Sequence, residues 1–366
     1  MTTRTARRRR GMLPPLAMAA ALSLLAGCQP EVVQIAGPTM GSSYKVSYVK
    51  DRKAPGAEEV RAEVEKILGE LDQAVSTYRD DSAVARFNAL PAGACMSMPE
   101  DALALADSAM RLRQGAEAAY DITMLPVLDA WGFGPGAAAR KASADQGELT
   151  VDALQKVPEI PTRPSEQTLA ALRERIGQQH LYRQGRKLCK AAPIQIDFNS
   201  IAAGLAIDKI GNALSARGIG NYLVDVTGEI RGHGSKPDGA PWRIAIEAPV
   251  DHVRQAQRII ALQGQTISTS GDYRQYREVD GHRLSHMIDP RTLAPVTHRL
   301  AAVTVVHPLG VMADGYSTLL MVLGPEAGYR YAKEHDLPAL FVIREGDGFR
   351  SRSTPEFDRL FPKNQS

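Results

Sequence analysis

Apolar and polar residues alternate over residues 193–198, and from Ser200 onward the spacing changes to that of a packed helix. This pattern predicts a strand that runs into a helix, with the change of period at Asp197 to Ser200. The start of a helix leaves backbone N–H groups unpaired and presents the positive end of the peptide dipoles, so such a corner attracts anions. Small residues over 202–206 would let a ligand lie close to the backbone. An ordinary strand, a Ser200 N-cap and a tightly packed helix would give the same pattern.

The rest of the chain also divides into helical and strand-like periods. Residues 57–74 have the apolar spacing of an amphipathic helix, and residues 44–49 alternate like a strand. Further helices are predicted over 82–88, 99–118, 165–176 and 313–323, the last closed by Gly324 and followed by another helix. Further strands are predicted over 180–182, 187–189, 222–226, 242–246, 258–262, 266–269, 276–279, 283–288 and 302–306, followed by a hairpin through 346–348. The mixture predicts an α+β fold with mixed, mainly antiparallel sheets and packed helices.

The amino terminus has the pattern of an export signal. Arg4 and a run of arginines over 7–10 precede an apolar stretch over 12–25, which is too short to be a dependable membrane span. The small residues that follow end directly on Cys28, and this ending resembles the bacterial lipobox. Residues 1–27 are therefore predicted to be a lipoprotein signal peptide, Cys28 the lipidated first residue of the mature protein, and residues 28–36 a tether. A plain exported protein with an incidental cysteine is the alternative.

The net charge and the cysteine content of the chain limit the classes of function that it can have. Removal of residues 1–27 takes away five arginines and no acidic residue, so the formal charge changes from +3 to −2. The basic character therefore belongs to the signal, which argues against a general nucleic-acid surface on the folded part. Cys95 and Cys189 remain, and an exported protein permits a disulfide between them without requiring one. Residues 132–164 are rich in Gly, Ala, Pro and charge, and are predicted to be a surface insertion.

Several short stretches have the residue types of a phosphate or metal site. Residues 226–229 interrupt a buried strand with glycine, and residues 266–272 place four hydroxyls beside a glycine turn. Asp314 and Thr318 are four residues apart and share a helix face, which suits a hard cation such as Mg²⁺ with its preference for oxygen ligands. As the acidic first turn of a helix, the same residues need no metal.

Taken together and in order, these motifs resemble the ApbE-like family of FAD:protein FMN transferases. The motifs are Met40-Gly41, Tyr120-Asp121-Ile122-Thr123, 197–208, Thr227-Gly228-Glu229-Ile230, 268–273, 286–292 and 314–318. The resemblance extends over about residues 33–345 and places a flavin transferase domain, ApbE-like or T-fold-like, over residues 37–355. A lipobox is also usual in that family.

The resemblance implies a Mg²⁺-dependent reaction in which a threonine hydroxyl of a target protein attacks FAD on the FMN side and AMP leaves. It implies that Asp314, Thr318 and Ser200 hold the cation, with help from Ser317. His286 is the candidate for steering or deprotonating the threonine. The residues expected to line the FAD site are Met40, Tyr78, Ala119, Tyr120, Asp121, Asp197, Ala203 and Ile288.

The chain also departs from the family pattern. Asn199 and Thr227 stand where glycines are usual, and Ala203 stands where a lysine is often found, so a charge that could contact FAD is missing. The expected targets are exported redox proteins that carry an acceptor threonine. The expected location is the periplasmic face of the bacterial cell envelope, with a lipid anchor in the inner rather than the outer membrane. Two alternatives stay open: an FAD pyrophosphatase that releases FMN and AMP, and a non-catalytic flavin-binding lipoprotein.

Overall fold

A computed structural model describes residues 31–52, 54–136, 163–247, 256–272, 276–279, 282–346 and 348–362. The predicted signal peptide, Cys28 and most of the predicted insertion at 132–164 lie outside these ranges. Within them, every helix is too short or too polar to span a bilayer.

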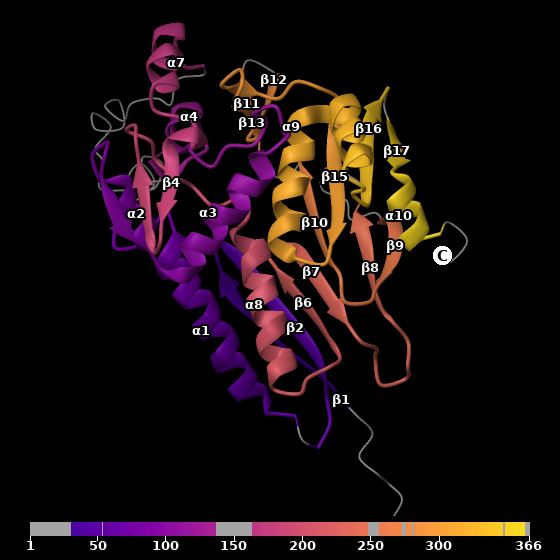
Figure 1. The fold of residues 1–366 in the computed structure, drawn as a ribbon. Coiled ribbons are helices and arrows are strands. Elements are labelled where there is room, and N and C mark those ends of the chain that lie inside the picture. Colours follow the sequence, from indigo (N-terminus) through magenta and orange to yellow (C-terminus); the bar gives the residue numbers. More distant parts are fainter. Residues whose placement is uncertain are drawn as a thin grey trace, which may run out of the picture.

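An eight-stranded antiparallel sheet forms the centre of the molecule, with the strand order β1-β2-β6-β7-β10-β15-β16-β17 (Figure 1). Its strands are β1 (Glu31–Thr39), β2 (Ser42–Lys50), β6 (Tyr222–Val226), β7 (Glu229–His233), β10 (Thr266–Gly271), β15 (Leu300–His307), β16 (Ala339–Glu345) and β17 (Gly348–Ser353). The predicted α+β class with mainly antiparallel pairing is confirmed.

Helices cover one face of this sheet, and a hairpin with a short helix covers the other. The covering helices are α1 (Ala57–Val75), α3 (Glu100–Arg113), α8 (Ala202–Ala216) and α9 (Gly310–Glu334). On the second face, β8 (Trp242–Glu247), β9 (Ala256–Leu262) and α10 (Pro355–Leu360) enclose a separate apolar cluster that includes Ile244, Leu262 and Phe357. Strand β15 and most of β16 are therefore buried on both faces.

Smaller elements surround the end of the molecule at which α7 lies (Figure 1). They are α2 (Ala83–Asn88), β3 (Cys95–Ser97), α4 (Leu125–Trp131), α7 (Glu166–Arg173), the 3₁₀ turn Gln178–His180, β4 (Leu181–Gln184), β5 (Lys187–Lys190), β11 (Tyr276–Val279), β12 (His282–Ser285), β13 (Ile288–Asp289) and β14 (Ala294–Pro295). Cys95 and Cys189 face each other on β3 and β5 and form a disulfide, which settles the pairing that the sequence left open.

The predicted tether at 28–36 is wrong from Glu31 onward, because β1 begins there and pairs with β2 over its whole length. Ile35 is buried, and Gly37 leaves room for the ring of Tyr44, whose Cε1 would lie 2.7 Å from a Cβ at that position. At the other end, α10 extends the domain past 355, since Phe357 is fully buried.

The strand predicted over 193–198 is also wrong: this segment belongs to no sheet. Its backbone is held instead by distant partners. The Asn88 side chain accepts from the N–H of Ile196 at 2.8 Å and donates to its carbonyl at 2.9 Å, and the Asp197 N–H donates to the Ile122 carbonyl at 2.7 Å. The alternation of apolar residues is real, because Ile194, Ile196 and Phe198 are fully buried, but the hydrogen bonds of a strand are replaced by these contacts.

Other element boundaries differ from prediction for local reasons. The helix predicted over 99–118 ends at Arg113, since Gly115, Glu117 and Ala118 all have positive φ. The strand predicted over 283–288 divides into β12 and β13. Helix α9 begins at Gly310, three residues before the predicted start. The predicted end of the first helix at Gly324 is confirmed, since Gly324 has a non-helical φ of 81° and a second helical segment follows it within α9.

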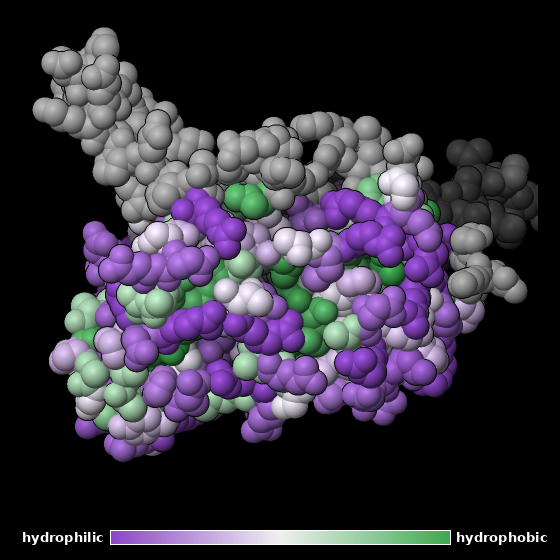
Figure 2. All heavy atoms as spheres, turned by 90° about the horizontal axis from the view of Figure 1, so that it is seen from above, coloured by the Kyte–Doolittle hydropathy of each residue, from purple (hydrophilic) through white to green (hydrophobic). Residues whose placement is uncertain are grey.

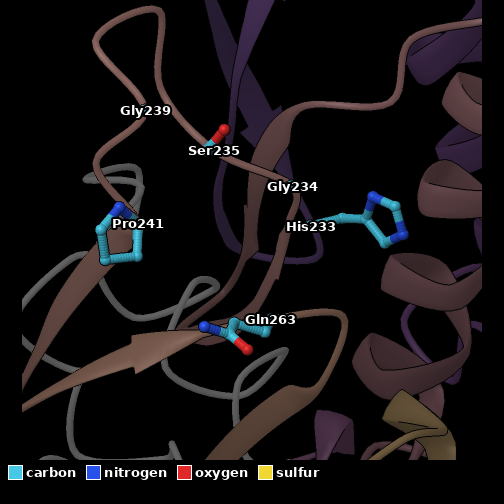
Figure 3. Close-up of a pocket in the computed structure, with 6 residues that line it drawn as sticks. All are labelled: His233, Gly234, Ser235, Gly239, Pro241 and Gln263. Atoms are coloured by element: carbon cyan, nitrogen blue, oxygen red, sulfur yellow. The ribbon is translucent and has the colours of Figure 1, made fainter.

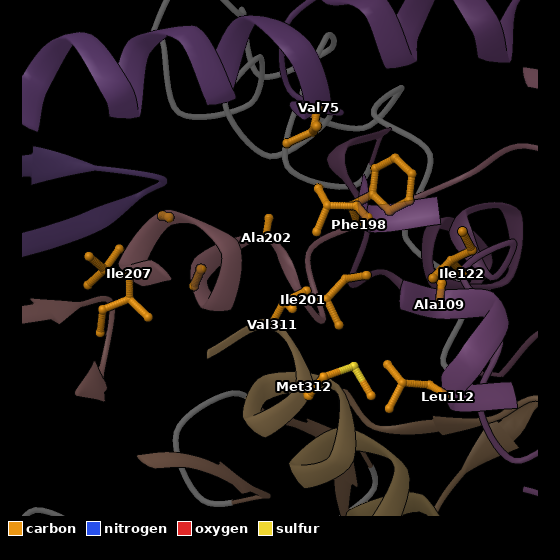
Figure 4. Packing of buried hydrophobic residues seen from close by; sticks show 14 of the residues in the cluster. Val75, Ala109, Leu112, Ile122, Phe198, Ile201, Ala202, Ile207, Val311 and Met312 are labelled. Carbon is orange, nitrogen blue, oxygen red and sulfur yellow. The ribbon is translucent and has the colours of Figure 1, made fainter. Parts of the chain in front are cut away.

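The first turns of α8 and α9 are in backbone contact and cap each other. A Cβ at Gly204 would lie 2.3 Å from the Gly310 carbonyl oxygen, so the crossing requires glycine. Asp208 of α8 accepts from the N–H groups of Gly310 and Val311 at 2.7 and 3.1 Å, and Asp314 of α9 accepts from the Gly204 N–H at 2.9 Å. Figure 4 shows the apolar packing around this crossing, where α8, α9 and α3 meet.

Candidate functional site

Asp314 is the central polar residue at the crossing of α8 and α9. Its side chain is almost fully buried, and Gly204 supplies its one hydrogen bond within the described part of the chain. Burial raises the pKa of Asp314 well above its ordinary value, the nearby Glu229 carboxylate raises it further, and the Gly204 N–H opposes both. Two carboxyl groups that repel each other in a buried place form a site that a cation would stabilise.

A row of hydroxyls leads from Glu229 to the predicted metal ligands. The Ser268 hydroxyl donates to Glu229 Oε1 at 3.4 Å and lies 3.1 Å from the Ser317 hydroxyl. Ser270 lies 2.8 Å from Ser317 and 3.5 Å from Thr318, so β10 presents its hydroxyls to α9. The Ser317 hydroxyl also donates to the carbonyl of Asp314 at 2.9 Å, which holds it against its own helix. Ser317 and Thr318 therefore lie beside Asp314 in a patch of oxygen atoms.

Ser200 has a different role from the N-cap that its pattern also allowed. Helix α8 begins at Ala202 with Ile201 in the N-cap position, so the Ser200 hydroxyl does not cap it. That hydroxyl lies 2.9 Å from the hydroxyl of Tyr120, which is buried. The pKa of Tyr120 is raised by burial and, more weakly, by the charges of Asp314, Asp197 and Asp121, while the bond to Ser200 lowers it. Ser200 and Tyr120 therefore lie near the carboxylates of Asp314, Asp197 and Asp121.

Asp197 and Tyr78, both predicted to line the FAD site, lie near each other. Burial raises the pKa of Asp197 to about 6, and Asp129 adds to the rise. The Asn199 N–H and side-chain amide oppose it, because they donate to the two Asp197 oxygens at 2.7 and 3.2 Å. Tyr78 is 61% exposed, and its pKa is raised by partial burial and by the charges of Asp197 and Asp129. An exposed aromatic ring beside a buried carboxylate suits the flat ring of a ligand.

Asp121 is fully engaged by the protein itself. Its Oδ1 accepts from the N–H and hydroxyl of Thr123 at 2.8 and 2.6 Å, and its Oδ2 accepts from Arg113 and from the Gln178 N–H, both at 2.9 Å. The carboxylate therefore fixes the turn that carries Tyr120, and leaves little capacity for a ligand.

The apolar residues predicted to line a flavin site are spread over several elements. Ala119 and Ala203 are buried, Ala203 in the first turn of α8, and Met40 occupies the turn between β1 and β2 with φ of 46°. Ile288 of β13 is buried with α4 in a third apolar cluster. His286, two residues before Ile288, is half-buried, and its ring lies edge-on to that of Phe133 at 6.4 Å between centroids. Seen from the end that carries α7 and the β11–β12 hairpin, the surface is mainly hydrophilic with hydrophobic patches between (Figure 2).

Comparison with known proteins decides the family. The model of the ApbE family matches residues 40–341. The chain belongs to the ApbE family. A curated relative from Vibrio cholerae, FAD:protein FMN transferase, is 36% identical over 94% of this chain and 98% of its own length. One of the same name from Klebsiella pneumoniae is 35% identical over 93% of this chain and 95% of its own. The chain is accordingly an enzyme of the transferase class.

Solved ApbE structures share the fold. The flavinyl transferase ApbE of Pseudomonas stutzeri, in its apo form, is 48% identical, with a TM-score of 0.79 over 91% of this chain and 98% of its own. The flavin transferase ApbE of Vibrio cholerae is 35% identical, with a TM-score of 0.78 over 90% of this chain and 99% of its own. Because nearly the whole of each known structure is matched, the chain shares the fold of these transferases.

Three polar residues of this ApbE-family site were not among the predicted site residues. Glu229, Ser268 and Ser270 lie within the polar stretches noticed in the sequence, but nothing there showed that β7 and β10 would present them to α9. The signal that the sequence offers is a set of hydroxyl residues and one acidic residue beside glycines. Such a set indicates that a ligand can approach the backbone there, but it does not show which side chains lie together in the fold.

Two hollows on the surface differ in whether residues of the candidate site line them. One of about 260 Å³ lies beside the β6–β7 turn and includes Thr227, Gly228 and Glu229. Another of about 360 Å³ is lined by His233, Gly234, Ser235, Gly239, Pro241 and Gln263 (Figure 3). The His233 ring points away from Pro241, stacks on Tyr222 and bonds the Gly220 carbonyl through Nδ1 at 2.8 Å. This second hollow therefore contains none of the residues predicted for FAD or metal.

The Asp197 carboxyl makes stability depend on pH. Its pKa rises from 3.8 in the unfolded chain to about 6 in the fold, so the folded state binds its proton more tightly. Stability is therefore lost as pH rises from about 4 to about 6, by about 3 kcal/mol in total. We expect Asp197→Asn to be more stable than the wild type by up to that amount at about pH 7.5, and equal to it below about pH 4, in urea unfolding.

Asp80→Asn, at an exposed position, is the matched control and should follow the wild type at both values of pH. An Asp197→Asn variant with the same stability as the wild type at high pH would show that the carboxyl is not desolvated.

Proposed function

We propose that this protein transfers FMN from FAD to a threonine hydroxyl of exported target proteins and releases AMP. The threonine oxygen forms a bond to the phosphorus on the FMN side, the bond from that phosphorus to the bridging oxygen breaks, and AMP leaves with that oxygen. The threonine proton passes to a base or to solvent. The observation that carries the proposal is Asp314: a buried carboxyl near Glu229 and beside the hydroxyls of Ser317 and Ser268, in a chain whose relatives are named FAD:protein FMN transferase.

The donor set of this site fits a magnesium ion. It consists of oxygen atoms, and the described residues contain no group of three or more His, Cys, Asp or Glu side chains that could hold a metal by themselves. Mg²⁺ is commonly bound by one or two carboxylates together with substrate phosphates, which is what Asp314 with Thr318, Ser200 and Ser317 could offer. Such an ion would supply neutralisation of the negative charge of the FAD diphosphate.

The protein's own residues would position FAD and its acceptor. Phosphoryl transfer needs alignment and charge neutralisation more than covalent help from the enzyme. Tyr78 offers an exposed ring, and the Asp121 network holds Tyr120 next to Ser200. We propose that Met40, Ala119, Asp197, Ala203 and Ile288 complete the FAD wall. His286, the proposed base, lies two residues before Ile288 and would have to reach the acceptor hydroxyl.

We also propose where in the cell the protein acts. The signal-like residues 1–27 and Cys28 would place the mature protein on the periplasmic face of the cell envelope, lipid-anchored to the inner membrane. Flavin-bearing subunits of membrane electron-transport complexes would be targets within its reach.

The test is a two-substrate assay. The purified protein is mixed with FAD and Mg²⁺, with and without a redox domain that carries an acceptor threonine. We expect fluorescent flavin bound covalently to the domain, and AMP in equal amount. The same domain with its acceptor threonine replaced by valine is the control and should stay unlabelled. AMP release that does not depend on the domain would show an FAD pyrophosphatase instead, and FAD binding without AMP would show a non-catalytic flavin protein.

A further inference from the structure

Thr227 has an unusual backbone conformation for its residue type. It lies in the turn between β6 and β7 with φ of 57°. Of the six non-glycine residues with positive φ in the described part of the chain, only Thr227 is β-branched. A β-branched side chain in this left-handed region is a true outlier, because it crowds the backbone. Such strain tends to be kept where the local geometry serves the site.

The conformation gives the Thr227 hydroxyl a definite partner. It donates to Glu229 Oε2 at 2.7 Å, while Ser268 donates to the other oxygen at 3.4 Å. The turn is itself fixed, since the Thr227 N–H donates to the Ser43 carbonyl at 3.0 Å and the Gly228 N–H donates to Asp225 Oδ1 at 3.1 Å. The Glu229 carboxylate is thus held on both sides within a rigid turn.

Glu229 in turn connects to the hydroxyls of α9. From Ser268 the contacts continue to Ser317 at 3.1 Å and from Ser317 to Ser270 at 2.8 Å, and Ser270 lies beside Thr318. A shift of Glu229 would move the acceptor of the Ser268 hydroxyl and so change how the hydroxyls around Ser317 and Thr318 are oriented.

We propose that Thr227 is a positioning residue of this transferase: its hydroxyl fixes the Glu229 carboxylate, which orders the hydroxyls of Ser268, Ser270 and Ser317 next to Thr318. The inference rests on the proposed function for the reaction it serves. It gives a role to an acid and a turn that the sequence marked only as a polar stretch, and it explains why a strained threonine occupies a position that glycine would fill without strain.

Three substitutions at this position separate the hydroxyl from the strain. Thr227→Ser keeps the hydroxyl, Thr227→Val keeps the shape without it, and Thr227→Gly removes both the hydroxyl and the strain. We expect Thr227→Ser to retain wild-type kinetics. We expect the other two to lose about 10- to 100-fold in kcat/KM and to need more Mg²⁺ for half-maximal rate, as is typical when a supporting partner of a site is removed. Thr227→Gly should nevertheless melt at a higher temperature than the wild type.

The readouts are AMP release against FAD and Mg²⁺ concentration, the melting temperature, and its rise on addition of Mg²⁺ with FAD. Asp336→Gly is the matched control, because Asp336 has φ of 51° in an exposed turn away from the site. It should melt higher with unchanged kinetics. Thr227→Gly with wild-type kinetics, or Thr227→Ser as impaired as Thr227→Gly, would overturn the inference. A wild-type protein that releases no AMP would instead refute the proposed function.

Discussion

Replacement of Asp314 by asparagine is expected to reduce Mg²⁺-dependent FAD turnover by about 100- to 1000-fold, the usual cost of removing a main electrostatic contact of a transition state. Asparagine keeps the size of the side chain and can still accept from the Gly204 N–H, so the helix crossing should persist. It removes a buried charge that Glu229 repels, and the free energy of unfolding at neutral pH should therefore stay equal or rise. The measurements are AMP release against Mg²⁺ concentration and urea unfolding of the same samples.

Asp208 provides the control, because it caps the start of α9 as Asp314 caps the start of α8. Its Oδ1 accepts from Gly310 at 2.7 Å and from Arg231 at 2.8 Å, so Asp208→Asn should lower the free energy of unfolding by about 1 to 3 kcal/mol. Its Mg²⁺ concentration for half-maximal rate should not change. Wild-type turnover in Asp314→Asn at limiting Mg²⁺ would remove Asp314 from the metal site.

The sequence predicted those parts of the fold whose pattern is local. Helix α1 follows the prediction to within one residue, because its buried positions recur at helical spacing. Strand β2 and the β4–β5 and β16–β17 hairpins follow from alternation around turn residues. In the helix and the two hairpins, the residues that make the hydrogen bonds are neighbours along the chain, whereas β2 also pairs with the distant strand β6.

The predictions failed where a distant residue supplies the hydrogen bonds. The segment 193–198 has the alternation of a strand, but Asn88, about a hundred residues away, takes the place of a neighbouring strand. Ser200 has the residue type of an N-cap, yet Tyr120 holds its hydroxyl. Helix α9 starts early because Asp208 caps it from another helix. No local period contains such contacts.

The candidate site likewise has parts that the local sequence pattern predicts and parts that only the fold reveals. The spacing of Asp314 and Thr318 on one helix face could be read directly, and the structure adds hydroxyls from β10 beside that face. The proximity of Glu229 to Asp314 could not be predicted from the sequence, since it depends on the packing of α9 against β7 and β10. The sequence shows that Thr227 replaces the glycine usual in the family, but not what the threonine does. In the structure its hydroxyl donates to the Glu229 carboxylate.

Removal of the Cys95–Cys189 disulfide is expected to have the largest effect on stability. The two cysteines are 94 residues apart, and closing a loop of that length stabilises a fold by about 4 to 5 kcal/mol through the lost entropy of the unfolded chain. The double variant Cys95→Ser/Cys189→Ser should therefore unfold at much lower urea concentration than the wild type, or fail to fold at about 37 °C.

The disulfide should also affect the site, because the residue after Cys189 supports it. Lys190 is buried, and its ammonium donates to the carbonyls of Asn88 and Ile194, both at 3.1 Å. Asn88 in turn holds Ile196, next to Asp197. Loosening β5 should thus raise the KM for FAD more than it lowers kcat. Dithiothreitol should bring the wild type to the level of the double variant and leave the variant unchanged. If full reduction, verified by thiol titration, leaves the wild-type unfolding midpoint where it was, the bond does not support the fold in this way.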